Sequence, residues 1–134
     1  MDFSDVGHLA LCCFLAGRAD DGWKYLRGTI GESCMRMVAP GAFMCVLEGK
    51  SIDFSDTTSM FACTVIEGLF GYCPQALAGL VELASAMPEA LPKLEWRIPD
   101  AHACWERTED GIRFAWSLKE TAGKLRIRLP LHRQ

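Results

Sequence analysis

Residues 93–131, KLEWRIPDAHACWERTEDGIRFAWSLKETAGKLRIRLPL, decide the fold that this sequence predicts. Apolar and polar side chains alternate along this stretch with a period of two, as they do in strands with one buried face. The alternation covers 93–98, 102–107, 112–118 and 124–131. Asp110-Gly111 and Ala122-Gly123 lie between successive runs and are turn-forming pairs. We therefore expect a C-terminal antiparallel β meander of three to four strands over 93–131.

The first 92 residues show mainly helical spacing. Apolar residues predict one helix from Ser4 to about Gly17, and a second that Asp20 caps and that extends as far as Met37. Two further helices are expected over 57–70 and 75–87. The run 42–54 is compatible with a strand or a short helix, because continuous apolar runs do not discriminate between them.

The expected fold class is therefore α+β. We predict a single domain over 1–134, in which a helical N-terminal two-thirds (1–92) packs on the β meander (93–131). The length of 134 residues, with 50% hydrophobic and 23% charged residues, is typical of one globular domain with its own core. This composition is unlike that of disordered chains.

The cysteines predict a reducing compartment. There are seven, and an odd number cannot close completely into intramolecular disulfides. They lie among apolar neighbours, where free cysteine packs as a small hydrophobic residue. Asp2 and Asp5 precede the apolar run 6–15, whereas export signals carry basic residues there. No apolar run approaches the roughly 18 residues of a membrane span. We expect a cytoplasmic protein without a membrane partner.

Charge is divided unevenly along the chain. The first 92 residues hold five basic and eleven acidic residues, whereas the remainder holds nine basic and six acidic residues. The net charge is −3 and the isoelectric point is about 5.6. Nucleic acid is an unlikely partner, because the overall charge is acidic and the aromatic residues of the meander alternate onto its apolar face.

No motif for catalysis or metal binding stands out. His102 and Cys104 share a strand face, and His8 and Cys12 are one helical turn apart, but the paired short spacings of zinc sites are absent. Cys73 precedes a predicted helix, whose N-terminal end could activate its thiol, yet no base accompanies it in sequence. We predict no catalytic residue, metal or cofactor, and no enzymatic activity.

The function expected first is that of a protein-binding or inhibitory module, of the immunity or anti-activator type, which docks on a macromolecular partner. Tryptophan and arginine are enriched at binding hot spots. The residues expected to form the interface are Trp23, Arg27, Arg97, Arg113, Arg126 and Arg128. Two alternatives stay open: a small-molecule-sensing regulatory domain with a pocket between helices and sheet, and an enzyme of unrecognised type. A homodimer is also compatible with the sequence.

Overall fold

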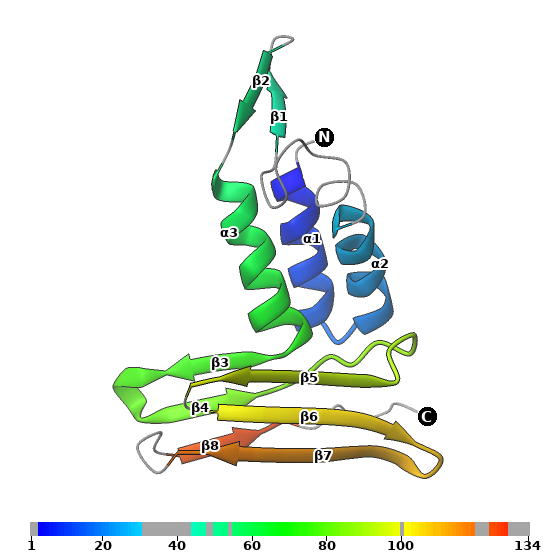
Figure 1. Cartoon of the computed structure of the whole chain (residues 1–134), viewed down its shortest axis with the longest axis vertical. Coiled ribbons are helices and arrows are strands. Elements are labelled where there is room, and N and C mark those ends of the chain that lie inside the picture. The colour runs from blue at the N-terminus through cyan, green and yellow to red at the C-terminus, as the bar shows by residue number, and fades with distance from the viewer. Residues whose placement is uncertain are drawn as a thin grey trace.

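The structure is a computed structural model that describes residues 3–30, 44–47, 50–53, 55–99, 101–119 and 124–128. Helices α1, α2 and α3 stand together on one side of the strands β3 to β8, and the hairpin of β1 and β2 lies at the far end of the helices (Figure 1). The protein is therefore an α+β structure, as the sequence predicts.

Helix α1 (Phe3–Leu15) ends where the sequence predicts. Gly17 adopts φ 75°, the amide of Arg18 donates to the carbonyl of Cys13 (2.8 Å), and the amide of Gly17 donates to Phe14 (3.0 Å). These bonds satisfy carbonyls that the helix end leaves open, and the left-handed backbone suits glycine. None of the helices in these ranges is long and apolar enough to cross a membrane.

Helix α2 (Ala19–Thr29) begins two residues earlier than predicted. Arg18 occupies the N-cap position, and Asp20 lies inside the first turn, so the prediction that Asp20 caps this helix is wrong. The carboxylate of Asp20 instead accepts a hydrogen bond from the amide of Glu89, 2.7 Å away. The predicted extension of this helix to Met37 lies outside the described residues.

Helix α3 (Ser55–Cys63) continues as a π-helical segment, η2 (Thr64–Leu69). Together the two segments cover most of the helix predicted over 57–70. Phe14 of α1 is 4% exposed and lies between Gly22 and Gly68. A Cβ added at either glycine would come within 2.9 Å of the Phe14 ring. Small residues thus let α2 and η2 approach α1 closely.

The predicted meander is present as β5 (Lys93–Ile98), β6 (Ala101–Thr108) and β7 (Gly111–Leu118). β6 pairs antiparallel with both neighbours, and Trp105 lies opposite Leu94 and Phe114. Leu94, Trp96 and Trp105 are buried, whereas Glu95 and Arg97 are exposed. The alternation in the sequence therefore identifies the buried face correctly.

The fourth predicted strand has a different neighbour. β8 (Lys124–Ile127) pairs in parallel with β4 (Leu80–Leu83), which pairs antiparallel with β3 (Tyr72–Gln75). The prediction that 124–131 extends the meander is wrong, and residues 129–131 lie outside the described ranges. A period of two indicates a strand but carries no information about its partner.

The predicted helical N-terminal two-thirds is also wrong. The segment 75–87 forms the end of β3, the 3-10 turn η3 (Ala76–Ala78), strand β4 and an irregular segment, not a helix. The run Leu80–Leu83 is too short for its apolar pattern to separate strand from helix, and pairing with β3 and β8 decides it. The open run 42–54 contains two strands, β1 (Met44–Leu47) and β2 (Lys50–Asp53).

One hydrophobic core joins the helices to both sheets. It includes Phe14 of α1, Leu26 of α2, Leu83 of β4, and Trp96 and Trp105 of the meander. Tyr72 of β3 contacts Trp96 edge-on, with 5.0 Å between ring centroids. An aromatic contact therefore links the two sheets within this core.

Candidate functional site

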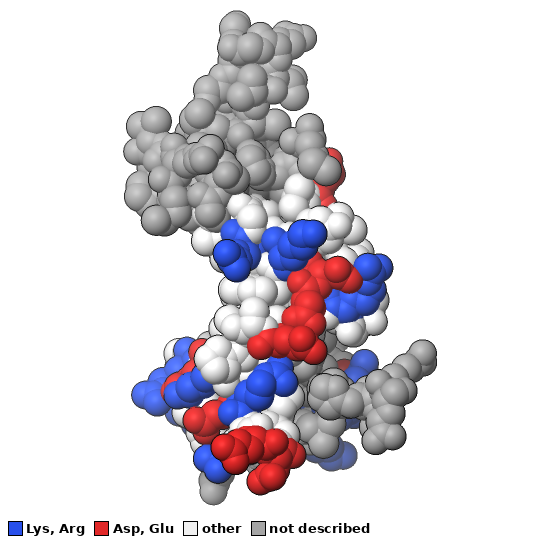
Figure 2. Space-filling model, turned by 90° about the vertical axis from the view of Figure 1, so that its right-hand side faces the viewer, with Lys and Arg blue, Asp and Glu red and all other residues white. Residues whose placement is uncertain are grey.

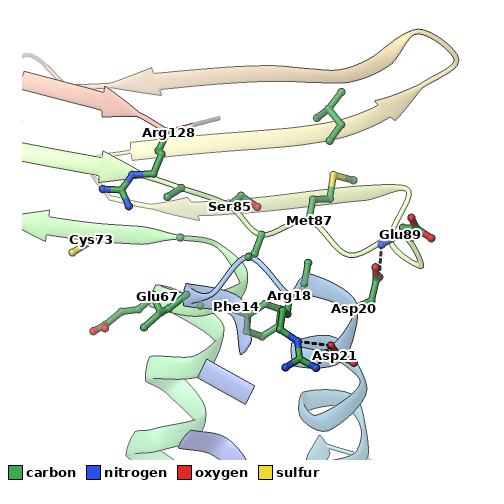
Figure 3. Close-up of a pocket in the computed structure, with 18 of the residues that line it drawn as sticks. Phe14, Arg18, Asp20, Asp21, Glu67, Cys73, Ser85, Met87, Glu89 and Arg128 are labelled. Atoms are coloured by element: carbon green, nitrogen blue, oxygen red, sulfur yellow. Dashed lines mark hydrogen bonds and ion pairs between the residues drawn. The ribbon is translucent and has the colours of Figure 1, made fainter. Parts of the chain in front are cut away.

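A cleft of about 520 Å³ opens where the helices meet the sheets. Its helical side is formed by the end of α1, the start of α2 and η2, and its other side by β3, β4 and the segment 84–89 (Figure 3). Arg107, Ile112 and Arg128 complete the lining from β6, β7 and the residue after β8. The cleft thus draws on every layer of the fold.

Apolar side chains lie in the middle of the cleft, beside an ion pair between Arg18 and Asp21 (2.8 Å). Figure 3 shows Phe14 and Met87 between the two charged ends, and Ala84, Ala86 and Ile112 also line the cleft. The hydroxyl of Ser85 is buried and donates to the carbonyl of Leu69 (3.1 Å), so its hydrogen is not available to a ligand. This surface suits the apolar body of a small ligand.

Asp20, Glu89 and Arg107 form one charged end. The amide of Glu89 donates to Asp20 (2.7 Å), and Arg107 Nη2 donates to the carbonyl of Pro88 (3.3 Å). Arg107 Nε is buried and has no hydrogen-bond partner among the residues that the structure describes. Carboxylates and a guanidinium therefore meet around the segment 88–89, which can present both signs of charge to one ligand.

Glu82, Arg128, Cys73 and Glu67 form the other charged end. Figure 3 shows Cys73, Glu67 and Arg128 together on this side. The side chain of Glu82 is only 10% exposed, and its carboxylate lies 2.6 Å from Arg128 and 3.5 Å from Arg126. Burial of a carboxylate is costly unless it is paired, so these arginines have a structural task.

The six residues predicted as an interface do not form one surface. Trp23 packs against the core and Arg27 lies exposed on α2. Arg97 and Arg113 lie on the outer face of the meander, on strands at its two edges. Arg126 and Arg128 flank Glu82, and of the six only Arg128 lines the cleft.

Two residues of the cleft were missed at the sequence level, although a signal for them exists. Arg107 continues the buried phase of Ala103 and Trp105, and Glu82 interrupts the apolar run Leu80–Leu83. A charged residue in an apolar phase requires a partner or a polar cavity. Here both residues line the same cleft.

The uneven charge of the sequence does not separate into acidic and basic faces in the view of Figure 2. Acidic and basic side chains are intermixed there, on the helical part and on the sheets. A partner approaching this face meets both signs of charge.

The outer face of the meander carries a compact set of ion pairs. Glu95 lies 2.5 Å from Lys93 Nζ and 2.9 Å from His102 Nε2. The hydrogen bond from Lys93, and then that from His102, lower the pKa of Glu95 to about 2, from 4.5. Arg113 binds Glu106 (3.3 Å) on the same face.

The lowered pKa of Glu95 predicts a pH effect on stability. A carboxyl group whose pKa is lower in the folded chain stabilises it fully above pH 4.5, and this contribution is lost as the pH falls toward 2. We expect Glu95→Gln to flatten the fall in unfolding free energy over this range, measured by urea denaturation at stepped pH. Glu109→Gln, at an exposed carboxylate in the β6–β7 turn, is the control. An unchanged pH slope in Glu95→Gln would contradict the assignment.

The cysteines that the structure describes, Cys12, Cys13, Cys63, Cys73 and Cys104, are free thiols. Among the described residues, no group of three or more histidine, cysteine or acidic side chains could hold a metal ion. His102 uses Nε2 to contact Glu95.

Comparison with protein-family models, with curated proteins and with solved structures found no significant match to this chain. The functional argument therefore rests on the cleft and on the surfaces of the strands.

Proposed function

We propose that this protein is a small-molecule-sensing domain whose ligand occupies the cleft between the helices and the sheets. The observation that carries the proposal is the cleft itself, whose volume of about 520 Å³ lies within the usual range of ligand pockets. Pockets of this kind combine an apolar lining with a few polar groups that orient the ligand. A ligand held between two layers also has the means to shift their packing, as a sensor requires.

The charges around the cleft favour a zwitterionic ligand. Arg107 lines the cleft, and its guanidinium offers a planar set of donors suited to a carboxylate. Asp20 and Glu89 lie at the same end and suit an ammonium group. With Phe14 and Met87 as apolar neighbours, the ligand class is an amino acid or short peptide with a large apolar side chain.

A matched set of ligands tests this proposal: phenylalanine and Phe-Leu, with phenethylamine and 3-phenylpropionate as singly charged analogues. At a hundredfold excess over Kd, a ligand stabilises the folded state by about 2.7 kcal/mol, which raises Tm by several degrees. We expect the zwitterions to raise Tm more than either analogue. Arg107→Met should weaken binding of the carboxylate ligands about tenfold or more and leave phenethylamine unaffected, as measured by calorimetry.

Arg97→Met is the matched control, because Arg97 is an exposed arginine on the outer face of the meander, away from the cleft. It should leave binding unchanged. Unaltered Tm with all four compounds would contradict the ligand class. Equal affinity of Arg107→Met and the unsubstituted chain for phenylalanine would contradict the role of Arg107.

Docking on a protein partner is a second candidate. It is favoured by exposed apolar side chains on the helices, namely Leu9 and Leu15 of α1 and Ile66 of η2. Large apolar side chains at a surface are common in interaction sites. The Arg107→Met variant separates the two candidates, since it should weaken zwitterion binding but leave partner docking intact.

A further inference from the structure

Strand β7 lies at an edge of its sheet. Among the described residues it is bonded to β6 on one side and has no strand on the other. A free edge presents unpaired backbone donors and acceptors, and proteins usually blunt such edges with proline, charge or short length. Whether β7 is blunted in this way therefore decides if it is open for pairing.

The other edges of the two three-stranded sheets are blunted, whereas β7 is not. β3 contains Pro74, β8 is four residues long with Lys124 and Arg126, and β5 alternates Lys93, Glu95 and Arg97. β7 has eight residues without proline and with a single charge. That charge, on Arg113, is already bound by Glu106 at 3.3 Å.

The inner face of β7 is apolar and only partly covered. Ile112, Phe114 and Leu118 are half-buried, and Trp116 is 49% exposed. Ala103, which lies opposite Trp116 on β6, is fully buried. The apolar surface thus becomes exposed at the β7 edge, where a further strand would cover it.

We propose that β7 pairs antiparallel with β7 of a second copy of this chain, so that two meanders join into one six-stranded sheet. Residues opposite each other in an antiparallel pair have side chains on the same face of the sheet. In a two-fold pair of β7 strands, one residue must therefore lie opposite its own copy across the axis. An axis at Ala115 places Phe114 opposite Trp116 of the other copy, twice by symmetry. It also places Ile112 opposite Leu118.

The same register is compatible with the charges. Arg113 then lies opposite Ser117 of the other copy, and no like charges face each other. An axis at Trp116 would instead place Arg113 opposite Lys119, which is unfavourable. Because the same patch meets itself across the axis, the contact closes as a dimer.

The test exploits the predicted opposition of residues 113 and 117. Ser117 is exposed on the outer face, so substitutions there should leave the fold intact. Ser117→Arg faces Arg113 of the other copy and should weaken the dimer about threefold or more, whereas Ser117→Glu should strengthen it by a similar factor. Sedimentation of each purified variant in the analytical ultracentrifuge, over a concentration series, measures the dimer Kd.

Trp116→Ser should weaken the dimer about tenfold or more, because it removes both aromatic pairs. Leu77→Ser is the control, since Leu77 is fully exposed in η3 and lies outside β7. Circular dichroism and Tm establish that each variant is folded. A monomer at all concentrations, a dimer that Trp116→Ser leaves intact, or equal effects of Ser117→Arg and Ser117→Glu would overturn the proposal. A monomer that binds an extended apolar peptide at this edge would overturn it as well.

Discussion

Replacing Gly71 with alanine is expected to destabilise the folded chain by at least about 3 kcal/mol. Gly71 adopts φ +63°, where a residue with a Cβ is strained by about 1–2 kcal/mol. The added Cβ would also overlap the carbonyl group of Ala84 and lie 2.5 Å from the amide nitrogen of Ser85. Denaturant unfolding measures the loss.

The backbone around Gly71 has little room to adjust. The amide of Ala84 donates to the carbonyl of Gly71 (2.9 Å), and the Ser85 hydroxyl donates to Leu69 (3.1 Å). Moving the two segments apart to admit a Cβ would break these bonds, which join the end of η2 to the end of β4. Gly71, Ala84 and Ser85 also line the cleft, so its shape depends on the same contact.

Gly79→Ala is the matched control for this prediction. Gly79 has a similar φ of +56°, but no atom of the described residues lies within 4 Å of an added Cβ. Its replacement should cost only the conformational strain, about 1 kcal/mol. If Gly71→Ala cost no more than Gly79→Ala, the close approach to Ala84 and Ser85 would not be a constraint on folding.

The meander was predictable because its signals are local. A period of two over 93–118 and the turn pair Asp110-Gly111 specify strands, their buried face and the order of their pairing. The strand Leu80–Leu83 was not predictable in this way, since a run of four residues, three of them apolar, suits either secondary structure. Its identity depends on Lys124–Ile127, which is distant in sequence and pairs with it in parallel.

The cleft was not predictable from local patterns for the same reason. It combines the α1–α2 connection, the end of η2, the segment after β4 and residues of three further strands. Only the packing of helices on sheets brings these segments together. What the sequence does contain is Glu82 and Arg107, two charges in apolar phases, and these indicate a polar site without showing where it lies.

Replacing both Arg126 and Arg128 with methionine is expected to destabilise the chain by about 2–3 kcal/mol. These arginines are the counter-charges of Glu82, whose side chain is 10% exposed, at 3.5 and 2.6 Å respectively. Their removal leaves a buried carboxylate without a partner, which is the costly way to break an ion pair. The expected loss of unfolding free energy is smaller than for a fully buried ion pair, because the arginine side chains are 62% and 69% exposed.

Adding Glu82→Leu to the double variant separates this cause from a simple loss of arginine packing. Leucine removes the unpaired carboxylate, so the triple variant should recover most of the lost unfolding free energy. Arg113→Met is the control, because its partner Glu106 is 47% exposed, and it should cost less than about 1 kcal/mol. A triple variant no more stable than the double variant would show that the arginines stabilise the fold in another way.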